Sequence, residues 1–250
     1  MRVDINCDMG EGFGRYTLGR DSELIPLVSS VNIACGMHAG DPLVMEKTVR
    51  LAAAFGVRVG AHPGYPDLQG FGRRAMDLTP EEVEAFVLYQ VSALAGFACA
   101  AGISLTHVKP HGALYNQAAQ DVVLARAVAR AVARFDTGLI LVGLAGSALI
   151  EAGVEQGLQV ANEGFPERGY NPDGTLMSRR QPGSVIDDPL RAAAQALNLV
   201  QNGIEMMTRE GERCRVGIDT LCIHGDSPNA LAVASAVRAA LLDNHITIGV

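Results

Sequence analysis

The stretch Ser104-Leu-Thr-His-Val-Lys-Pro-His-Gly-Ala-Leu-Tyr-Asn116 begins as a strand and ends in a loop. Side chains alternate between the two faces of a strand, so His107, Lys109 and His111 are expected on one face. Pro110 has no N–H to donate, which predicts that sheet pairing ends there. A lysine and a histidine at the end of a strand then point into the same space, an arrangement typical of an active site.

Further β-like runs alternate with amphipathic or alanine-rich stretches along the chain. The strand candidates are Arg2–Asn6, Val31–Cys35, Val57–His62, Leu105–Lys109, Leu139–Val142, Leu158–Asn162 and Asp219–His224. This alternation indicates parallel strands joined by right-handed crossovers. Capping residues followed by proline mark helix starts at Asp41-Pro42, Thr79-Pro80, Asp188-Pro189 and Ser227-Pro228. No internal repeat or low-complexity linker is apparent, so we expect a single domain over residues 1–250.

The faces of the strand candidates distinguish a barrel from an open sheet. Asp4, Asn6 and Asp8 share one face of the first strand, whereas the opposite face is aliphatic apart from Cys7. An open sheet covered by helices on both sides would instead have continuously apolar strands. We therefore predict an α/β fold of the TIM-like (β/α) barrel type, in a distorted form with seven strands. Its polar residues fall late in each strand, at the C-terminal rim where such barrels carry their chemistry.

Composition excludes several classes of protein. The net charge is −7 and the pI is about 5.3, which argues against a nucleic-acid-binding protein. The five cysteines include no C-x-x-C pair, so neither a disulfide framework nor a zinc knuckle is expected. The N-terminus has no apolar signal region, and the apolar stretch from Val91 to Leu105 is shorter than the roughly 20 residues that span a bilayer. These features predict a soluble, cytoplasmic protein with no membrane association.

Four histidines are candidates for chemistry because four separate strand ends would direct them into one cavity. They are His38, His62, His111 and His224. At least one of them is expected to act on a ligand, although the residues themselves do not rank the four. His107 should lie deeper in the barrel and is interpreted as a hydrogen-bonded core histidine.

Loops supply further candidates. The pairs Arg73-Arg74 and Arg179-Arg180 lie in loops rich in glycine and proline, where they are either solvated surface charge or an anion site. Gly10-Glu-Gly-Phe-Gly14 could present backbone N–H groups to an anion, but it lacks the dinucleotide spacing, and the chain has no G-x-x-x-x-G-K-[ST] phosphate loop. The long segment Asn162–Arg180 has little periodicity and is interpreted as a functional lid.

Six motifs, taken in order, resemble those of the LamB/YcsF family, from the first strand to the last helix. They are Asp4-Ile-Asn-Cys-Asp-Met-Gly-Glu11, Asn32-Ile-Ala-Cys-Gly-Met-His-Ala-Gly-Asp-Pro42, Gly60-Ala-His-Pro-Gly-Tyr-Pro-Asp67, Gly70-Phe-Gly-Arg-Arg74, His107-Val-Lys-Pro-His-Gly-Ala-Leu-Tyr-Asn116 and His224-Gly-Asp226. The resemblance implies a barrel related to the glycoside hydrolase/deacetylase group. It also implies ATP-dependent opening of 5-oxoproline (pyroglutamate) to L-glutamate by a 5-oxoprolinase, in which this chain would be the first of three components, with separate subunits B and C.

This chemistry assigns roles to the candidates. Asp8 or His62 would act as base on the attacking water, while Lys109 and His111 would stabilise the developing oxyanion or phosphate and protonate the leaving nitrogen. Substrate contacts are expected from Asn6, Glu11, His38, Arg73, Arg74, Tyr115, Asn116, Glu163, Arg179, His224 and Asp226. ATP would bind with Mg²⁺ as its counter-ion, at a site that the partner subunits help to complete.

Two alternatives stay open at this point. A metal-dependent amide hydrolase or deacetylase, acting on a small or carbohydrate substrate, would use ligands from Asp8, His38, His62 and His224. A non-catalytic small-molecule-binding protein would also need a cavity, but not several titratable groups within it. The residues do not determine the oligomeric state, so a homo-oligomer is compatible with them.

Overall fold

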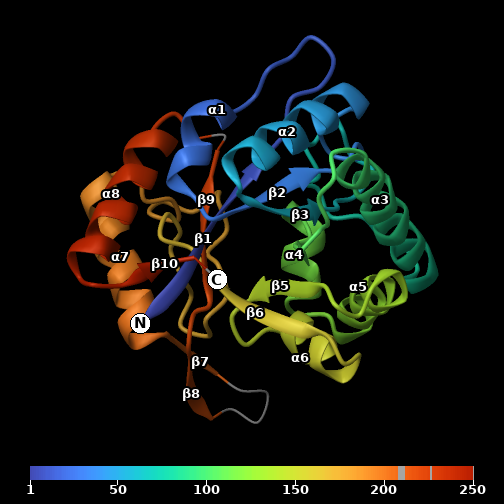
Figure 1. Ribbon diagram of the computed structural model, residues 1–250. Helices are drawn as coiled ribbons and strands as arrows, with labels where there is room; N and C mark the ends of the chain where they lie inside the picture. Colours follow the sequence, from blue (N-terminus) through green and yellow to red (C-terminus); the bar gives the residue numbers. More distant parts are fainter. Residues whose placement is uncertain (208–211, 226, 250) are drawn as a thin grey trace.

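A computed structural model, which describes residues 1–207, 212–225 and 227–249, has a closed barrel of parallel strands at its centre (Figure 1). Seven strands form the barrel: β1 (Arg2–Met9), β2 (Ser30–Ala34), β3 (Arg58–His62), β4 (His107–Val108), β5 (Ile140–Leu144), β6 (Gln159–Gly164) and β9 (Thr220–His224). Pairing of β1 with β9 closes it. The predicted seven-stranded (β/α) barrel is therefore confirmed.

Helices surround the strands on the outside of the barrel (Figure 1). The longer ones are α2 (Pro42–Phe55), α3 (Pro80–Ala100), α5 (Val122–Phe135), α6 (Ala148–Glu155), α7 (Pro189–Asn202) and α8 (Ala230–Asp243). Shorter ones are α1 (Asp21–Leu24), the 3₁₀ helix η1 (Ile25–Leu27) and α4 (Gly112–Ala118). The outward strand faces, such as Val3, Ile5 and Cys7 of β1, join these helices in the hydrophobic core. Cys7 is thus a small buried hydrophobic residue, as the strand pattern indicated.

Three of the four predicted helix caps are confirmed. Asp41 and Asp188 accept hydrogen bonds from backbone N–H groups of the first turns of α2 and α7, and Thr79 forms a reciprocal capping box with Glu82 at α3. The prediction for Ser227 was wrong, because α8 begins at Ala230. The Ser227 hydroxyl instead accepts from the N–H of Asn229 at 3.3 Å, which makes a local turn ahead of the helix.

The structure contains three strands that the sequence pattern did not predict. The antiparallel pair β7 (Ile204–Met207) and β8 (Arg213–Val216) lies outside the barrel, and Figure 1 shows it projecting beyond one end. The short β10 (Thr247–Ile248) pairs with the beginning of β1. These strands have four residues or fewer, too few for alternation to stand out.

Helix α3 is long and apolar enough, by length and composition alone, to cross a membrane. The expectation that no stretch reaches that length was therefore wrong, because the apolar run extends back to Pro80. Buried residues of α3 nevertheless recur every three or four positions, at Val83, Val87, Val91 and Leu94, and the helix packs against α5. One buried stripe of this kind is typical of a helix that covers a globular core.

Candidate active site

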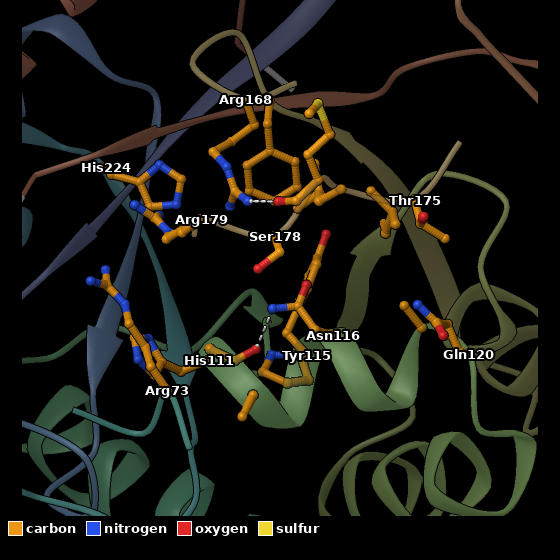
Figure 2. A pocket seen from close by; sticks show the side chains of 18 of the residues that line it. Arg73, His111, Tyr115, Asn116, Gln120, Arg168, Thr175, Ser178, Arg179 and His224 are labelled. Atoms are coloured by element: carbon orange, nitrogen blue, oxygen red, sulfur yellow. Dashed lines mark hydrogen bonds between the residues drawn. The ribbon is translucent and has the colours of Figure 1, made fainter. Parts of the chain in front are cut away.

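A cavity of about 710 Å³ opens at the C-terminal ends of the barrel strands. The strand ends contribute Asp8, His62, Lys109, His111 and His224 to its wall. Figure 2 shows residues of the segment after β6, among them Arg168 and Arg179, across the cavity from residues of α4 such as Tyr115 and Asn116. The predicted rim location of the polar groups is confirmed, and the segment interpreted as a lid does form one wall of the cavity.

Lys109 lies at the centre of a group of buried acceptors, here called the lysine cluster, that consists of Asp8, Lys109, Glu163 and Cys222. The ammonium nitrogen is 3.1 Å from Asp8 Oδ1, 2.8 Å from Glu163 Oε1 and 3.0 Å from Cys222 Sγ. Only 3% of the lysine is exposed. A buried cation between two carboxylates is held in a fixed position by directed hydrogen bonds.

The lysine cluster fixes the charge of its members. Burial alone would lower the pKa of Lys109, but the Asp8 carboxylate, the Cys222 sulfur and the Glu163 carboxylate outweigh burial and raise that pKa well above its ordinary value. Burial would raise the pKa of Asp8, yet His62 and Lys109 bring it well below its ordinary value. Burial raises the pKa of the Cys222 thiol despite the nearby ammonium. Lys109 is therefore charged, Asp8 ionised and Cys222 a neutral thiol.

Amide side chains in the barrel interior support the lysine cluster from below. Asn32 Nδ2 donates to Asp8 Oδ1 at 2.8 Å and to Asn6 Oδ1 at 2.7 Å, and Asn6 Nδ2 donates to Glu163 Oε1 at 2.9 Å. His107 Nε2 lies 2.7 Å from Asn32 Oδ1, a pure acceptor, so this nitrogen carries the proton. His107 is thus a hydrogen-bonded interior histidine, as expected from its depth in the strand.

A second group, here called the histidine cluster, consists of Glu11, His38, His62 and His111. One potential ligand atom from each lies within 4.8 Å of the others, and all four residues are buried. His62 Nε2 and His111 Nδ1 face each other at 3.0 Å, with the rings at 87°. His38 stacks on His111 with ring centroids 3.7 Å apart, and its two ring nitrogens have no hydrogen-bond partner among the described residues.

Arginines give the outer part of the cavity a positive character. Arg73, Arg74, Arg168, Arg179 and Arg180 all line it. Arg74 pairs with Asp67, and Arg73 stacks on the ring of Phe71 at 4.9 Å. Arg168 is buried, and burial together with the charge of Arg179 lowers its pKa to about 10. Such a wall is suited to an anionic ligand.

The structure distributes the predicted site residues between the cavity wall and a layer behind it. The wall contains Asp8, His62, Arg73, Arg74, Lys109, His111, Tyr115, Asn116, Arg179 and His224. Buried behind it, and not lining the cavity, are Asn6, Glu11, His38 and Glu163. Asp226 lies outside the described residues.

Two residues escaped the sequence analysis. Arg168 was passed over within its loop, although a cation in a glycine-rich lid was a usable signal. Cys222 was placed on the inward face but had no activating group next to it in sequence, and its contact with Lys109 spans 113 positions. The glycine-rich loop after β1 differs from expectation, because the N–H groups of Gly10 and Gly14 donate to Asp21 and Asp41.

The fold and the site together define the chain as a (β/α)-barrel enzyme with a buried lysine, carboxylates and histidines at the catalytic rim. The model of the LamB/YcsF family matches residues 3–249, and the chain belongs to that family. It is 55% identical to the A-type component of 5-oxoprolinase from Tolumonas auensis, over 99% of this chain and 98% of the relative.

Solved structures agree with this assignment. The lactam utilization protein from Thermus thermophilus superposes with a TM-score of 0.91 at 52% identity, over 100% of this chain and 99% of that protein. A T48 deacetylase shares the fold alone, with a TM-score of 0.50 and 16% identity over 99% of this chain and 86% of that one. The expected relation to the deacetylase group is therefore confirmed at the level of the fold.

Proposed function

We propose that this chain is the ring-opening subunit of a 5-oxoprolinase, a hydrolase that converts 5-oxoproline to L-glutamate at the expense of ATP. The observation that carries the proposal is the Lys109 ammonium, fixed between Asp8 and Glu163 on the floor of a cavity walled by arginines. The identity to chains named as components of 5-oxoprolinase supports the choice of a cyclic amide as substrate. Several titratable groups around one cavity argue against a purely binding role.

The substrate matches the character of the cavity. 5-Oxoproline carries one carboxylate, for which Arg168 and Arg179 offer guanidinium donors on the lid side. The lactam then extends toward Lys109 and the histidines on the opposite side. A cavity of about 710 Å³ is in the range of ordinary ligand pockets and exceeds what a single five-membered ring fills. The remaining space suits the phosphoryl group of an activated substrate.

The chemistry follows from the weak electrophilicity of an amide. Transfer of the γ-phosphoryl group of ATP to the lactam oxygen releases ADP and activates the carbonyl carbon. Water then adds to that carbon with loss of a proton to Asp8 or His62. The C–N bond breaks as the nitrogen gains a proton from His111, and hydrolysis of the resulting acyl phosphate by a second water gives glutamate and phosphate. Lys109 stabilises negative charge on the substrate oxygens throughout.

Nucleotide binding is the step that this chain is least equipped for. Its sequence has no phosphate-binding loop, and the N–H groups of Gly10 and Gly14 are engaged by Asp21 and Asp41. The relatives are named as one lettered component of an enzyme, which indicates an assembly of several subunits. We propose that subunits B and C complete the site for ATP and Mg²⁺, and that the assembly is soluble and cytoplasmic.

Glutamate release from 5-oxoproline tests this function. The purified chain, alone and with its B and C subunits, is supplied with ATP and Mg²⁺, and glutamate and ADP are measured together. We expect equal amounts of both products from the complete assembly and none when any component is left out. 2-Pyrrolidone, the same lactam without the carboxylate, should be a poor substrate. ATP-independent release of glutamate by the chain alone would contradict the proposal.

A further inference from the structure

The tautomers of the histidine cluster are fixed by backbone carbonyls. His62 Nδ1 lies 2.7 Å from the carbonyl oxygen of Lys109, and His111 Nε2 lies 2.8 Å from that of Phe71. Because a carbonyl oxygen only accepts, each of these nitrogens carries a proton. The other nitrogens, His62 Nε2 and His111 Nδ1, then direct their lone pairs at each other across 3.0 Å. Two facing lone pairs repel, so this contact is favourable only with a positive species between or on them.

The surroundings of the contact favour a cation. Asp8 Oδ2 lies 3.4 Å from His62 Nε2, and Glu11 Oε1 lies 3.9 Å from His111 Nδ1, so a carboxylate flanks each histidine. Burial, together with neighbouring positive groups that include Arg73, lowers the pKa of His111 well below its ordinary value and opposes a bound proton. A metal ion is held by ligand bonds from the two lone pairs and does not require a charged imidazole.

The distances also suit a metal. Two imidazole nitrogens bound to one zinc ion at about 2.0–2.1 Å lie roughly 3.0–3.4 Å apart, depending on the coordination angle. Ligating histidines commonly donate their second N–H to a backbone carbonyl, which sets the tautomer and the ring orientation. Both His62 and His111 do so. Phe71 adopts φ 56°, a left-handed conformation uncommon for a residue with a side chain, and its carbonyl is the one that holds His111.

His38 provides an independent sign of a ligand. Its side chain is fully buried, yet neither ring nitrogen has a partner among the described residues. A buried polar group without a partner is costly, so its retention calls for an explanation. Since His38 stacks parallel to His111, at an interplanar angle of 5°, the two lone pairs do not converge, and His38 reaches a shared ion only after its ring turns. No hydrogen bond within the described part of the chain opposes that rotation.

The lysine cluster shows by contrast where a metal would not bind. Asp8, Cys222 and His224 also have ligand atoms within 4.8 Å of one another. The Lys109 ammonium, however, already lies 3.1 Å from Asp8 Oδ1 and 3.0 Å from Cys222 Sγ, and a second cation there would be repelled. The histidine cluster is therefore the better of the two candidates.

We propose that Glu11, His38, His62 and His111 form a binding site for one divalent transition-metal ion of the Zn²⁺ type, with His62 Nε2 and His111 Nδ1 as its primary ligands. His62 and His111 line the cavity, whereas Glu11 and His38 lie behind them, so the ion would be held at the cavity floor with one side toward the substrate. Such an ion supplies Lewis-acid activation of a water or carbonyl oxygen. With the His62 lone pair engaged, Asp8 is the base that remains for the attacking water.

Metal binding by the purified full-length chain tests the proposal without substrate, ATP or partner subunits. The chain is freed of metal with a chelator and titrated with Co²⁺, whose visible absorption reports nitrogen ligation, and then with Zn²⁺ in competition. Metal content after equilibrium dialysis gives the stoichiometry. We expect one ion per chain and at least a hundredfold weaker binding in His62→Gln and His111→Gln. His38→Gln should weaken binding less, because its ring must first turn.

His107→Gln is the matched control, because His107 is also a buried histidine and lies on the strand that leads to His111. It should keep the wild-type stoichiometry and cobalt spectrum, while circular dichroism verifies that each variant is folded. Failure of the wild-type chain to bind Co²⁺ or Zn²⁺ at a one-to-one ratio would overturn the proposal. So would wild-type affinity in both His62→Gln and His111→Gln, or equal loss in His107→Gln. Because glutamate release is measured separately, neither result decides the proposed function.

Discussion

The lysine cluster and the histidine cluster lie side by side at the same end of the barrel, and both contain buried ionisable groups. In the lysine cluster, the protein supplies its own cation, and the Lys109 ammonium contacts the acceptors around it at 2.8 to 3.2 Å. In the histidine cluster, two basic nitrogens face each other at 3.0 Å between flanking carboxylates. The difference teaches that one cluster is electrostatically complete in the folded chain, while the other is arranged to receive a cation from outside.

The largest effect is expected from Lys109→Met, which removes the cation of the lysine cluster. Asp8 and Glu163 would then remain as buried carboxylates without their partner, a change that typically costs about 3–5 kcal/mol of stability. Loss of a group that stabilises a developing oxyanion lowers turnover by roughly 100- to 1000-fold. Glutamate release by the reconstituted assembly and chemical denaturation measure the two effects. Lys47→Met, on the exposed face of α2, should behave as wild type. Normal turnover in Lys109→Met would exclude the lysine from the mechanism.

The next effect concerns the histidine cluster and is a gain of stability on adding metal. A ligand present at 100 times its dissociation constant stabilises the folded state by about 2.7 kcal/mol, which corresponds to roughly 5–10 °C in melting temperature for a chain of this size. Calorimetry with and without Zn²⁺ should show this rise in the wild-type chain. The double variant His62→Gln/His111→Gln should show none. An equal rise in that variant would mean that zinc binds elsewhere.

A smaller effect is expected from Arg168→Gln, which changes the outer wall and leaves both clusters intact. Hydrogen bonds to charged groups contribute about 1.5–3 kcal/mol, so KM for 5-oxoproline should rise roughly tenfold or more while kcat changes little. Steady-state kinetics of the assembly provide the split between the two constants. Arg191→Gln, at an exposed position in the first turn of α7, is the control. A fall in kcat with unchanged KM would show that Arg168 acts on the reaction itself and not on binding.

The smallest effect is expected from Cys222→Ala. An ammonium has three protons, and without Cys222 the Lys109 nitrogen still contacts Asp8, Glu163 and Asn6. Turnover should therefore stay within about threefold of wild type, because the charge balance of the lysine cluster is preserved. Glutamate release measured beside Lys109→Met gives the comparison. A loss as large as that of Lys109→Met would make the thiol a participant in the chemistry.

The alternation of residues along the strands contained most of the fold. Asp4, Asn6 and Asp8 on one face and Val3, Ile5 and Cys7 on the other already distinguished a barrel from an open sheet, because the period of two is a local property of the backbone. The rim position of Lys109 and His111 followed from the same period and from Pro110. What the pattern missed, such as the pair β7 and β8, depends on contacts of short segments and leaves little periodic trace.

The composition of the two clusters was decided only by the tertiary structure. Sequence identified Asp8, Lys109 and the rim histidines as candidates, but it did not separate His62 and His111 from His224, and it gave no reason to join Cys222 to Lys109. Those pairings depend on which strands are neighbours in the closed barrel and on the orientation of each ring, as when the Lys109 and Phe71 carbonyls fix the tautomers of His62 and His111. Hydrogen bonds over 2.7 to 3.0 Å are determined by the packed geometry of the whole barrel, which no local period of the chain records.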